Sequence, residues 1–145
     1  LAIDPTHLHL AFDVTDASPW RNGANEPGTM YLFGDSVDLQ IGLDPDAPDD
    51  RTEPVAGDTR ISVAPVRGTP TALIHQPIVP GHTGPRVAFT SPVSSVEFDR
   101  AEVLRDAVVV ARVREGGYTV EASIPLASLG ATWPVDRSTR GDLGI

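Results

Sequence analysis

Four aspartates near the start of the chain have the type and spacing to hold a metal ion. Asp13 and Asp16 flank Thr15, and Asp35 and Asp38 begin the next regular segment. Hard carboxylate oxygens are the ligands that Ca²⁺ prefers, so carboxylates from both segments that meet at one end of the fold would form a calcium site. The alternative is structural, because aspartates in turns accept hydrogen bonds from backbone amides far more often than they bind metal.

A serine offers a second kind of chemistry. Gly34-Asp35-Ser36-Val37 resembles the opening block of the Gly-Asp-Ser-Leu esterases, whose serine is the nucleophile, and Asp4-Pro5-Thr6-His7 matches their Asp-x-x-His block. In those enzymes the serine lies where a strand gives way to a helix. Here Ser36 begins an alternating segment, and the Asp-x-x-His block comes before the serine instead of near the C-terminus. An esterase also requires a histidine within hydrogen-bonding reach of Ser36.

Aromatic residues in loops suggest a third chemistry, the binding of sugars. A flat indole matches the apolar face of a pyranose, and neighbouring donors can fix its hydroxyl groups. Trp20 lies among turn residues and is followed by Arg21 and Asn22, so these three residues are the first candidate for a sugar site. Trp133, before Pro134, is the second candidate. Either tryptophan could instead be buried under its loop, as large aromatic side chains usually are.

Haem binding is a remote alternative. Haem-binding sandwich domains use methionine with lysine or histidine as axial ligands. The chain has one methionine, Met30, and no lysine, so a pair of Met30 with one of the four histidines is the remaining arrangement.

The segments that carry these residues alternate with a period of two. Leu8, Leu10 and Phe12 fall on one face of the first segment, and Val37 and Leu39 on one face of the second. One apolar and one polar face is typical of an antiparallel sheet. Further strands are expected at Thr59 to Ala64, Thr71 to Ile78, Arg86 to Thr90, Ala107 to Arg114 and Tyr118 to Ile124, with a weaker one around Val96 and Phe98.

Turn residues complete this pattern. Glu115-Gly116-Gly117 supplies the positive-φ positions of a tight hairpin, and Pro125 to Gly130 is expected to form one helical turn. No long helical period is present. The sequence therefore predicts an all-β, immunoglobulin-like or jelly-roll-type antiparallel sandwich, with about eight or nine strands in the intact domain.

Length, charge and composition limit the number of domains and the classes of partner. A chain of 145 residues is long enough for one two-layer core, so residues 1–145 are expected to form a single domain. The net charge of −9 argues against nucleic acid as a partner. No apolar run approaches the ~20 residues of a membrane span, so no membrane partner is expected. The chain has no cysteine, which excludes disulfides and thiolate metal sites.

Three segments together resemble the family 9 carbohydrate-binding modules. They are Val14-Thr15-Asp16, Gly34-Asp35-Ser36-Val37, and Gly117-Tyr118 with Glu121 and Ile124-Pro125. The resemblance implies a β-sandwich that binds oligo- or polysaccharides, in which calcium is a known component. It also implies that the chain is a fragment, truncated at both ends, of an extracytoplasmic protein. The chain departs from the family where a tryptophan often precedes Gly-Asp-Ser, since Leu32 and Phe33 stand there.

The function expected from sequence is non-catalytic carbohydrate binding by a module of a larger extracytoplasmic bacterial protein, linked to the breakdown of xylan- or cellulose-type polysaccharide. The alternative is a sandwich domain without a ligand that packs against other domains of its parent chain. Exposure of the aromatics distinguishes the two, because a binding module must display Trp20 or Trp133 beside polar groups, whereas a structural domain would bury both.

Overall fold

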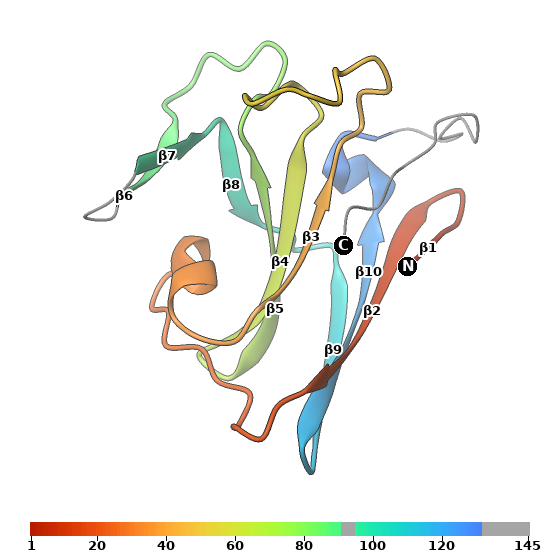
Figure 1. Ribbon diagram of the computed structural model, residues 1–145, viewed down its shortest axis with the longest axis vertical. Coiled ribbons are helices and arrows are strands. Elements are labelled where there is room, and N and C mark those ends of the chain that lie inside the picture. Colours follow the sequence, from red (N-terminus) through yellow and green to blue (C-terminus); the bar gives the residue numbers. More distant parts are fainter. Residues whose placement is uncertain (91–94, 132–145) are drawn as a thin grey trace.

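The computed structural model describes residues 1–90 and 95–131 and places two four-stranded antiparallel sheets face to face (Figure 1). In sheet A the order is β1 (Ala2–Ile3), β2 (His7–Thr15), β10 (Gly117–Pro125) and β9 (Val108–Arg114). In sheet B it is β3 (Val37–Ile41), β4 (Thr59–Val66), β5 (Thr69–Gln76) and β8 (Arg100–Val103). The predicted all-β antiparallel sandwich is confirmed.

The core between the sheets follows from the alternation in the sequence. In β10, Tyr118, Val120 and Ile124 are buried, and in β2 Leu8 and Leu10 join them. Sheet B contributes apolar residues from β3, β4 and β5, including Val37, Ile61, Val63, Ala72 and Ile74. Burial of each large apolar side chain contributes about 1.5–3 kcal/mol to folding, so this layer holds the two sheets together.

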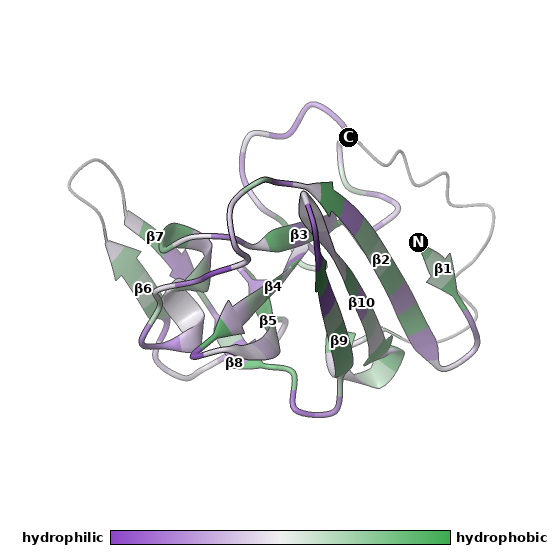
Figure 2. Ribbon diagram, turned by 90° about the horizontal axis from the view of Figure 1, so that it is seen from below, coloured by the Kyte–Doolittle hydropathy of each residue, from purple (hydrophilic) through white to green (hydrophobic). Residues whose placement is uncertain are grey.

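Sheet B is covered on both faces. The outer face of β4 and β5, away from sheet A, carries Ala64, Val66 and Leu73, which pack with Met30 in a second apolar cluster. Met30 belongs to the 3-10 helix η1 (Pro27–Leu32), and it is fully buried. Figure 2 shows β6 (Val87–Thr90) and β7 (Ser95–Phe98), a separate antiparallel pair, on this same side of sheet B.

Most turns follow the sequence prediction. Gly116, with a φ of 73°, closes the hairpin of β9 and β10, and the 3-10 helix η2 (Leu126–Leu129) ends at Gly130 in the left-handed region. The sequence pattern did not predict β1, β8 or η1. The two short 3-10 helices are the helical segments of the described residues, and neither is long or apolar enough to cross a membrane.

Candidate ligand site on the outer face of sheet B

Three polar side chains form a row across the outer face of sheet B. Gln40 of β3 is paired in register with Arg60 of β4, and Arg60 is paired with His75 of β5. Their neighbours in sequence, Ile61 and Ile74, face the core between the sheets. Because side chains alternate along a strand, Gln40, Arg60 and His75 all lie on the opposite face, away from sheet A.

His75 is the most unusual member of this row. It is fully buried, and neither ring nitrogen has a hydrogen-bond partner among the described residues. Burial lowers the pKa of His75 to about 4, and nearby Arg60 acts in the same direction. Asp38 and the Gly28 backbone offset part of the effect, although the Gly28 backbone does not reach hydrogen-bonding geometry with either ring nitrogen. The imidazole is therefore neutral at pH 7, with one donor and one acceptor both unused.

Aromatic rings surround His75. The ring centroids of Tyr31 and Phe89 lie 5.6 and 5.9 Å from that of His75, and Phe98 lies closer, at 4.9 Å. Tyr31 comes from η1, and the two phenylalanines come from β6 and β7, so three separate elements meet over one histidine. This aromatic cover is apolar, and it leaves the two imidazole nitrogens unsatisfied.

Arg60 is held rigidly beside this cover. Its Nε and Nη2 donate to the two carboxylate oxygens of Asp38 at 3.0 and 2.9 Å, and its guanidinium lies over the ring of Tyr31, 5.0 Å from the centroid. Burial opposes ionisation of Asp38, but the hydrogen bonds from Arg60 and from the Ser62 hydroxyl outweigh it and keep the pKa of Asp38 below its usual value. Such a bidentate pair fixes the orientation of the guanidinium.

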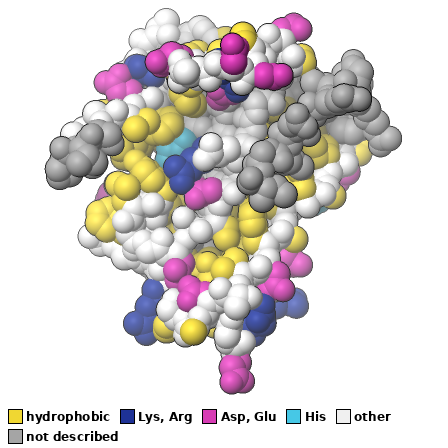
Figure 3. Space-filling model, viewed as in Figure 1, with side chains coloured by type: hydrophobic (Ala, Val, Ile, Leu, Met, Phe, Trp, Pro, Cys, Tyr) yellow, Lys and Arg dark blue, Asp and Glu magenta, His cyan; other side chains and the backbone are white. Residues whose placement is uncertain are grey.

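A hollow of about 420 Å³ opens next to these residues. Strands β3, β4 and β5 form its floor with Gln40, Arg60 and His75, and Phe98 borders it. The loop from β3 to β4 forms a wall that includes Arg51 and Asp58, which form an ion pair of 2.7 Å. Figure 3 shows this side of the molecule, where histidine, basic and acidic side chains meet at the edge of a hydrophobic patch. The volume lies within the range of small-molecule sites, about 300–1,000 Å³.

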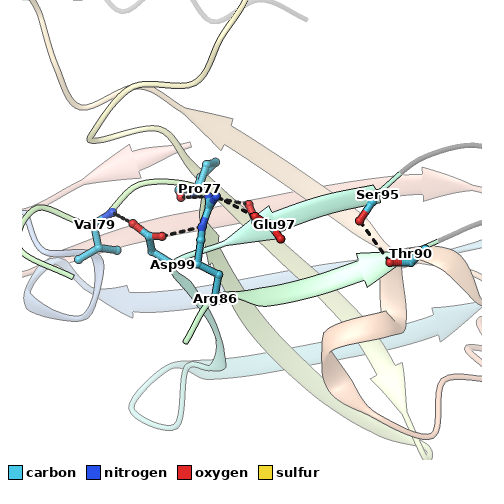
Figure 4. Close-up of polar contacts among 7 residues, drawn as sticks. All are labelled: Pro77, Val79, Arg86, Thr90, Ser95, Glu97 and Asp99. Carbon is cyan, nitrogen blue, oxygen red and sulfur yellow. Dashed lines mark hydrogen bonds and ion pairs between the residues drawn. The ribbon is translucent and has the colours of Figure 1, made fainter. Parts of the chain in front are cut away.

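Arg86 fixes the β6–β7 pair that supplies the aromatic cover. Its guanidinium donates to Asp99 at 2.9 Å, to the carboxylate of Glu97 at 3.0 Å and to the Pro77 carbonyl at 3.0 Å (Figure 4). Asp99 also accepts the Val79 amide at 2.9 Å. These contacts tie the base of the pair to the end of β5 and so position Phe89 and Phe98 over His75.

The structure corrects the position expected for Trp20. Trp20 is half-buried, packs against the core, and stacks on Tyr118 with ring centroids 5.3 Å apart. Its indole nitrogen is buried and has no partner among the described residues. Trp20 is therefore a cap on the end of the core and not an exposed platform, because the apolar ring gains more from contact with Tyr118 than from water.

The neighbours of Trp20 also have structural roles. The Asn22 amide group donates to the carbonyls of Met30 and Asp35 at 2.7 and 3.1 Å, and its carbonyl oxygen accepts the amide of Ala24. These three bonds occupy the group that was expected to hold a sugar. The Arg21 side chain is exposed, and its backbone amide donates to Asp35 at 2.8 Å. Trp133 lies outside the described residues.

The four candidate calcium ligands do not come together. Within the described residues, no group of three or more histidine and acidic side chains has a metal-binding arrangement. Asp13 pairs with Arg114, and Asp38 pairs with Arg60. Asp16 accepts the amide and hydroxyl of Ser18, which lowers its pKa, and Asp35 accepts the Arg21 amide. The predicted convergence is wrong, because each carboxylate is held by a partner of its own and no three of them meet among the described residues.

Ser36 and Met30 are also accounted for. The Ser36 hydroxyl donates to Asp38 at 3.4 Å, and none of the four histidines, all within the described residues, hydrogen-bonds to it. The arrangement therefore does not supply the base that a serine nucleophile needs. Met30 is fully buried and packed among Ala24, Ala64 and Leu73, so its side chain is part of an apolar cluster and is not displayed to a haem.

Comparison with known proteins identified no relative. No family model matches the chain, and no match was found among curated proteins or among solved structures.

Proposed function

We propose that this domain binds carbohydrate without catalysis and that its site is the hollow on the outer face of sheet B. The observation that carries the proposal is His75, a fully buried histidine on the floor of a hollow, whose two ring nitrogens have no partner among residues 1–90 and 95–131. An unsatisfied buried polar group costs about 1–3 kcal/mol, so a ligand that satisfies it recovers binding free energy. A sugar hydroxyl both donates and accepts, as the neutral imidazole does.

The rest of the hollow supports the same ligand class. Gln40 and Arg60 offer planar groups along the sheet, and Phe98 offers an apolar ring edge. Each ring nitrogen of His75 has less than 1 Å² exposed, so a ligand reaches it after a side chain of the aromatic cover turns aside. We infer the wider setting from the resemblance alone: a module of a larger extracytoplasmic protein that acts in polysaccharide breakdown.

A sandwich domain without a ligand is the second candidate. The packing of Trp20 against Tyr118 favours it, because an exposed Trp20 was the expected mark of a binding module. On this alternative, His75 is a buried polar residue that only reduces stability. The two candidates therefore differ in what they predict for His75.

An NMR titration of the domain with xylo-, cello- and galacto-oligosaccharides tests the proposal. We expect shifts confined to the His75 ring and to the amides of β3, β4 and β5, with a dissociation constant of roughly 10 µM to 1 mM. His75→Phe should abolish these shifts, because phenylalanine fills the space but offers no polar atom. His82→Phe is the matched control, since His82 is exposed and does not line the hollow. A folded wild type that no saccharide perturbs would reject carbohydrate binding.

A further inference from the structure

The hollow has more free hydrogen-bond donors than acceptors. The Nε and Nη2 groups of Arg60 are occupied by Asp38, which leaves both hydrogens of Nη1 and one of Nη2 without a partner among the described residues. Arg51 uses Nη2 for Asp58 and Nη1 for the Pro48 carbonyl, so its Nε–H has no partner in the described part of the chain. The side-chain amide of Gln40 is exposed and adds two further donors, together with one acceptor oxygen.

The charged and hydroxyl acceptors around the hollow already accept hydrogen bonds from the protein. Asp58 accepts Arg51 on one carboxylate oxygen and the Val55 amide on the other, at 2.7 and 3.0 Å. The Thr59 hydroxyl accepts from Gln76 at 3.1 Å and donates to the Gly57 carbonyl. A ligand that brings acceptors therefore finds partners here more readily than one that brings donors.

The charge of the hollow does not oppose an anionic ligand. Two arginines line the hollow, and each is paired with one aspartate, Arg51 with Asp58 and Arg60 with Asp38, so the hollow is close to neutral in a chain whose net charge is −9. Asp38 lies behind Arg60 and holds the edge of its guanidinium formed by Nε and Nη2. The edge formed by Nη1 and Nη2 stays open, and its two parallel N–H groups match the two oxygens of a second carboxylate.

We propose that the saccharide bound in this hollow carries a carboxylate, as a uronic acid does, and that the carboxylate binds the open edge of Arg60. This inference rests on the proposed carbohydrate-binding function, and it adds the class of sugar. The planar, bidentate match favours a carboxylate over other anionic groups.

The test compares a uronic acid with its own ester. Tri-galacturonic acid, its fully methyl-esterified form and neutral galactotriose are titrated into the domain, with the His75 ring signals as the readout. We expect the acid to bind at least about tenfold more tightly than the ester, as charge-assisted bonds are stronger than neutral ones. Added salt should weaken binding of the acid and leave binding of the ester nearly unchanged.

Gln40→Glu supplies the matched variant. Gln40 is exposed and has no hydrogen-bond partner among the described residues, so the exchange adds a negative charge next to Arg60 at little cost to the fold. The preference for the acid over the ester should fall by about fivefold or more. Thr119→Glu adds the same charge on the outer face of sheet A and should leave the preference intact.

Each outcome decides between the two proposals. Equal binding of acid and ester, or tighter binding of galactotriose, would overturn the carboxylate assignment and leave carbohydrate binding standing. A preference for the acid that Gln40→Glu does not reduce would place the carboxylate elsewhere and overturn the assignment to Arg60. If no saccharide perturbs the His75 signals, both proposals are overturned.

Discussion

Replacing His75 with phenylalanine should make the domain less sensitive to acid. In the folded protein burial lowers the pKa of His75 to about 4, whereas in the unfolded chain the group keeps its ordinary value of 6.5. Between these values the unfolded state binds a proton that the folded state does not. Stability from this group is therefore complete above pH 6.5 and is lost progressively as the pH falls towards 4.

The size of the loss follows from the two pKa values. Each pKa unit corresponds to about 1.36 kcal/mol, so a complete loss is about 3 kcal/mol, and most of it is reached by about pH 4.5. Because His75 is fully buried, solvent screening does not reduce this figure greatly. Phenylalanine has no proton to bind, and it removes two unsatisfied polar atoms, which should add about 1 kcal/mol to stability near neutral pH.

Urea unfolding at about pH 7.5 and about pH 4.5 measures both effects. Carboxylates also titrate in this range, so the informative quantity is the acid-induced loss of the wild type minus that of His75→Phe. We expect a difference of roughly 2 kcal/mol, and close to none for the exposed control His82→Phe. An equal acid-induced loss in wild type and His75→Phe would refute the inference that His75 is buried, neutral and unpartnered.

Four further predictions test the structural roles assigned above. In urea unfolding, Trp20→Ala should lower the free energy of unfolding by about 3 kcal/mol. Trp20→Phe should stay within about 1 kcal/mol of the wild type, because it keeps an aromatic ring and removes an indole N–H that has no partner among the described residues. Equal losses in the two variants would contradict a capping role. Arg86→Gln should raise amide hydrogen exchange in β6 and β7 but not in β10, and uniform protection in both would argue against Arg86 as the anchor of the aromatic cover. Ser36→Ala should cost less than about 1 kcal/mol, because its one bond to Asp38 is long; ester hydrolysis that disappears in this variant would contradict the assignment. Melting curves with Ca²⁺ and with chelator should coincide, because the four separated aspartates have protein partners, and a rise of several degrees with Ca²⁺ would oppose this account.

Most strand positions could be predicted from the sequence because alternation and turn residues are local patterns. Alternation places Leu8 and Leu10 in the core whatever lies opposite them, and Gly116 marks a turn through its own backbone. β8 was missed because Arg100–Val103 is short and half of it is charged. η1 was missed because Pro27–Leu32 has no apolar period, and its single buried residue, Met30, gains its burial only from sheet B.

The candidate site could not be predicted from local sequence patterns, because its residues are brought together only when the strands pair. Gln40, Arg60 and His75 are far apart in the chain, and they become neighbours only through the register of β3, β4 and β5. His75 was visible as a histidine within a strand, but its burial depends on rings from η1, β6 and β7. The predicted exposure of Trp20 was wrong because a position in a loop does not reveal that the side chain packs back onto Tyr118.

His75 separates the two functional interpretations most sharply. Its neighbours Ile74 and Leu73 show that β5 accepts apolar side chains on both faces, so an apolar residue at position 75 would fit the cluster of Tyr31 and Phe98. A polar group that reduces stability there is typical of a binding site, where the cost is offset when a ligand is bound. A His75→Phe variant that is more stable and no longer binds saccharide is the result that carbohydrate binding requires. A variant that is more stable and otherwise unchanged is what a purely structural domain would give.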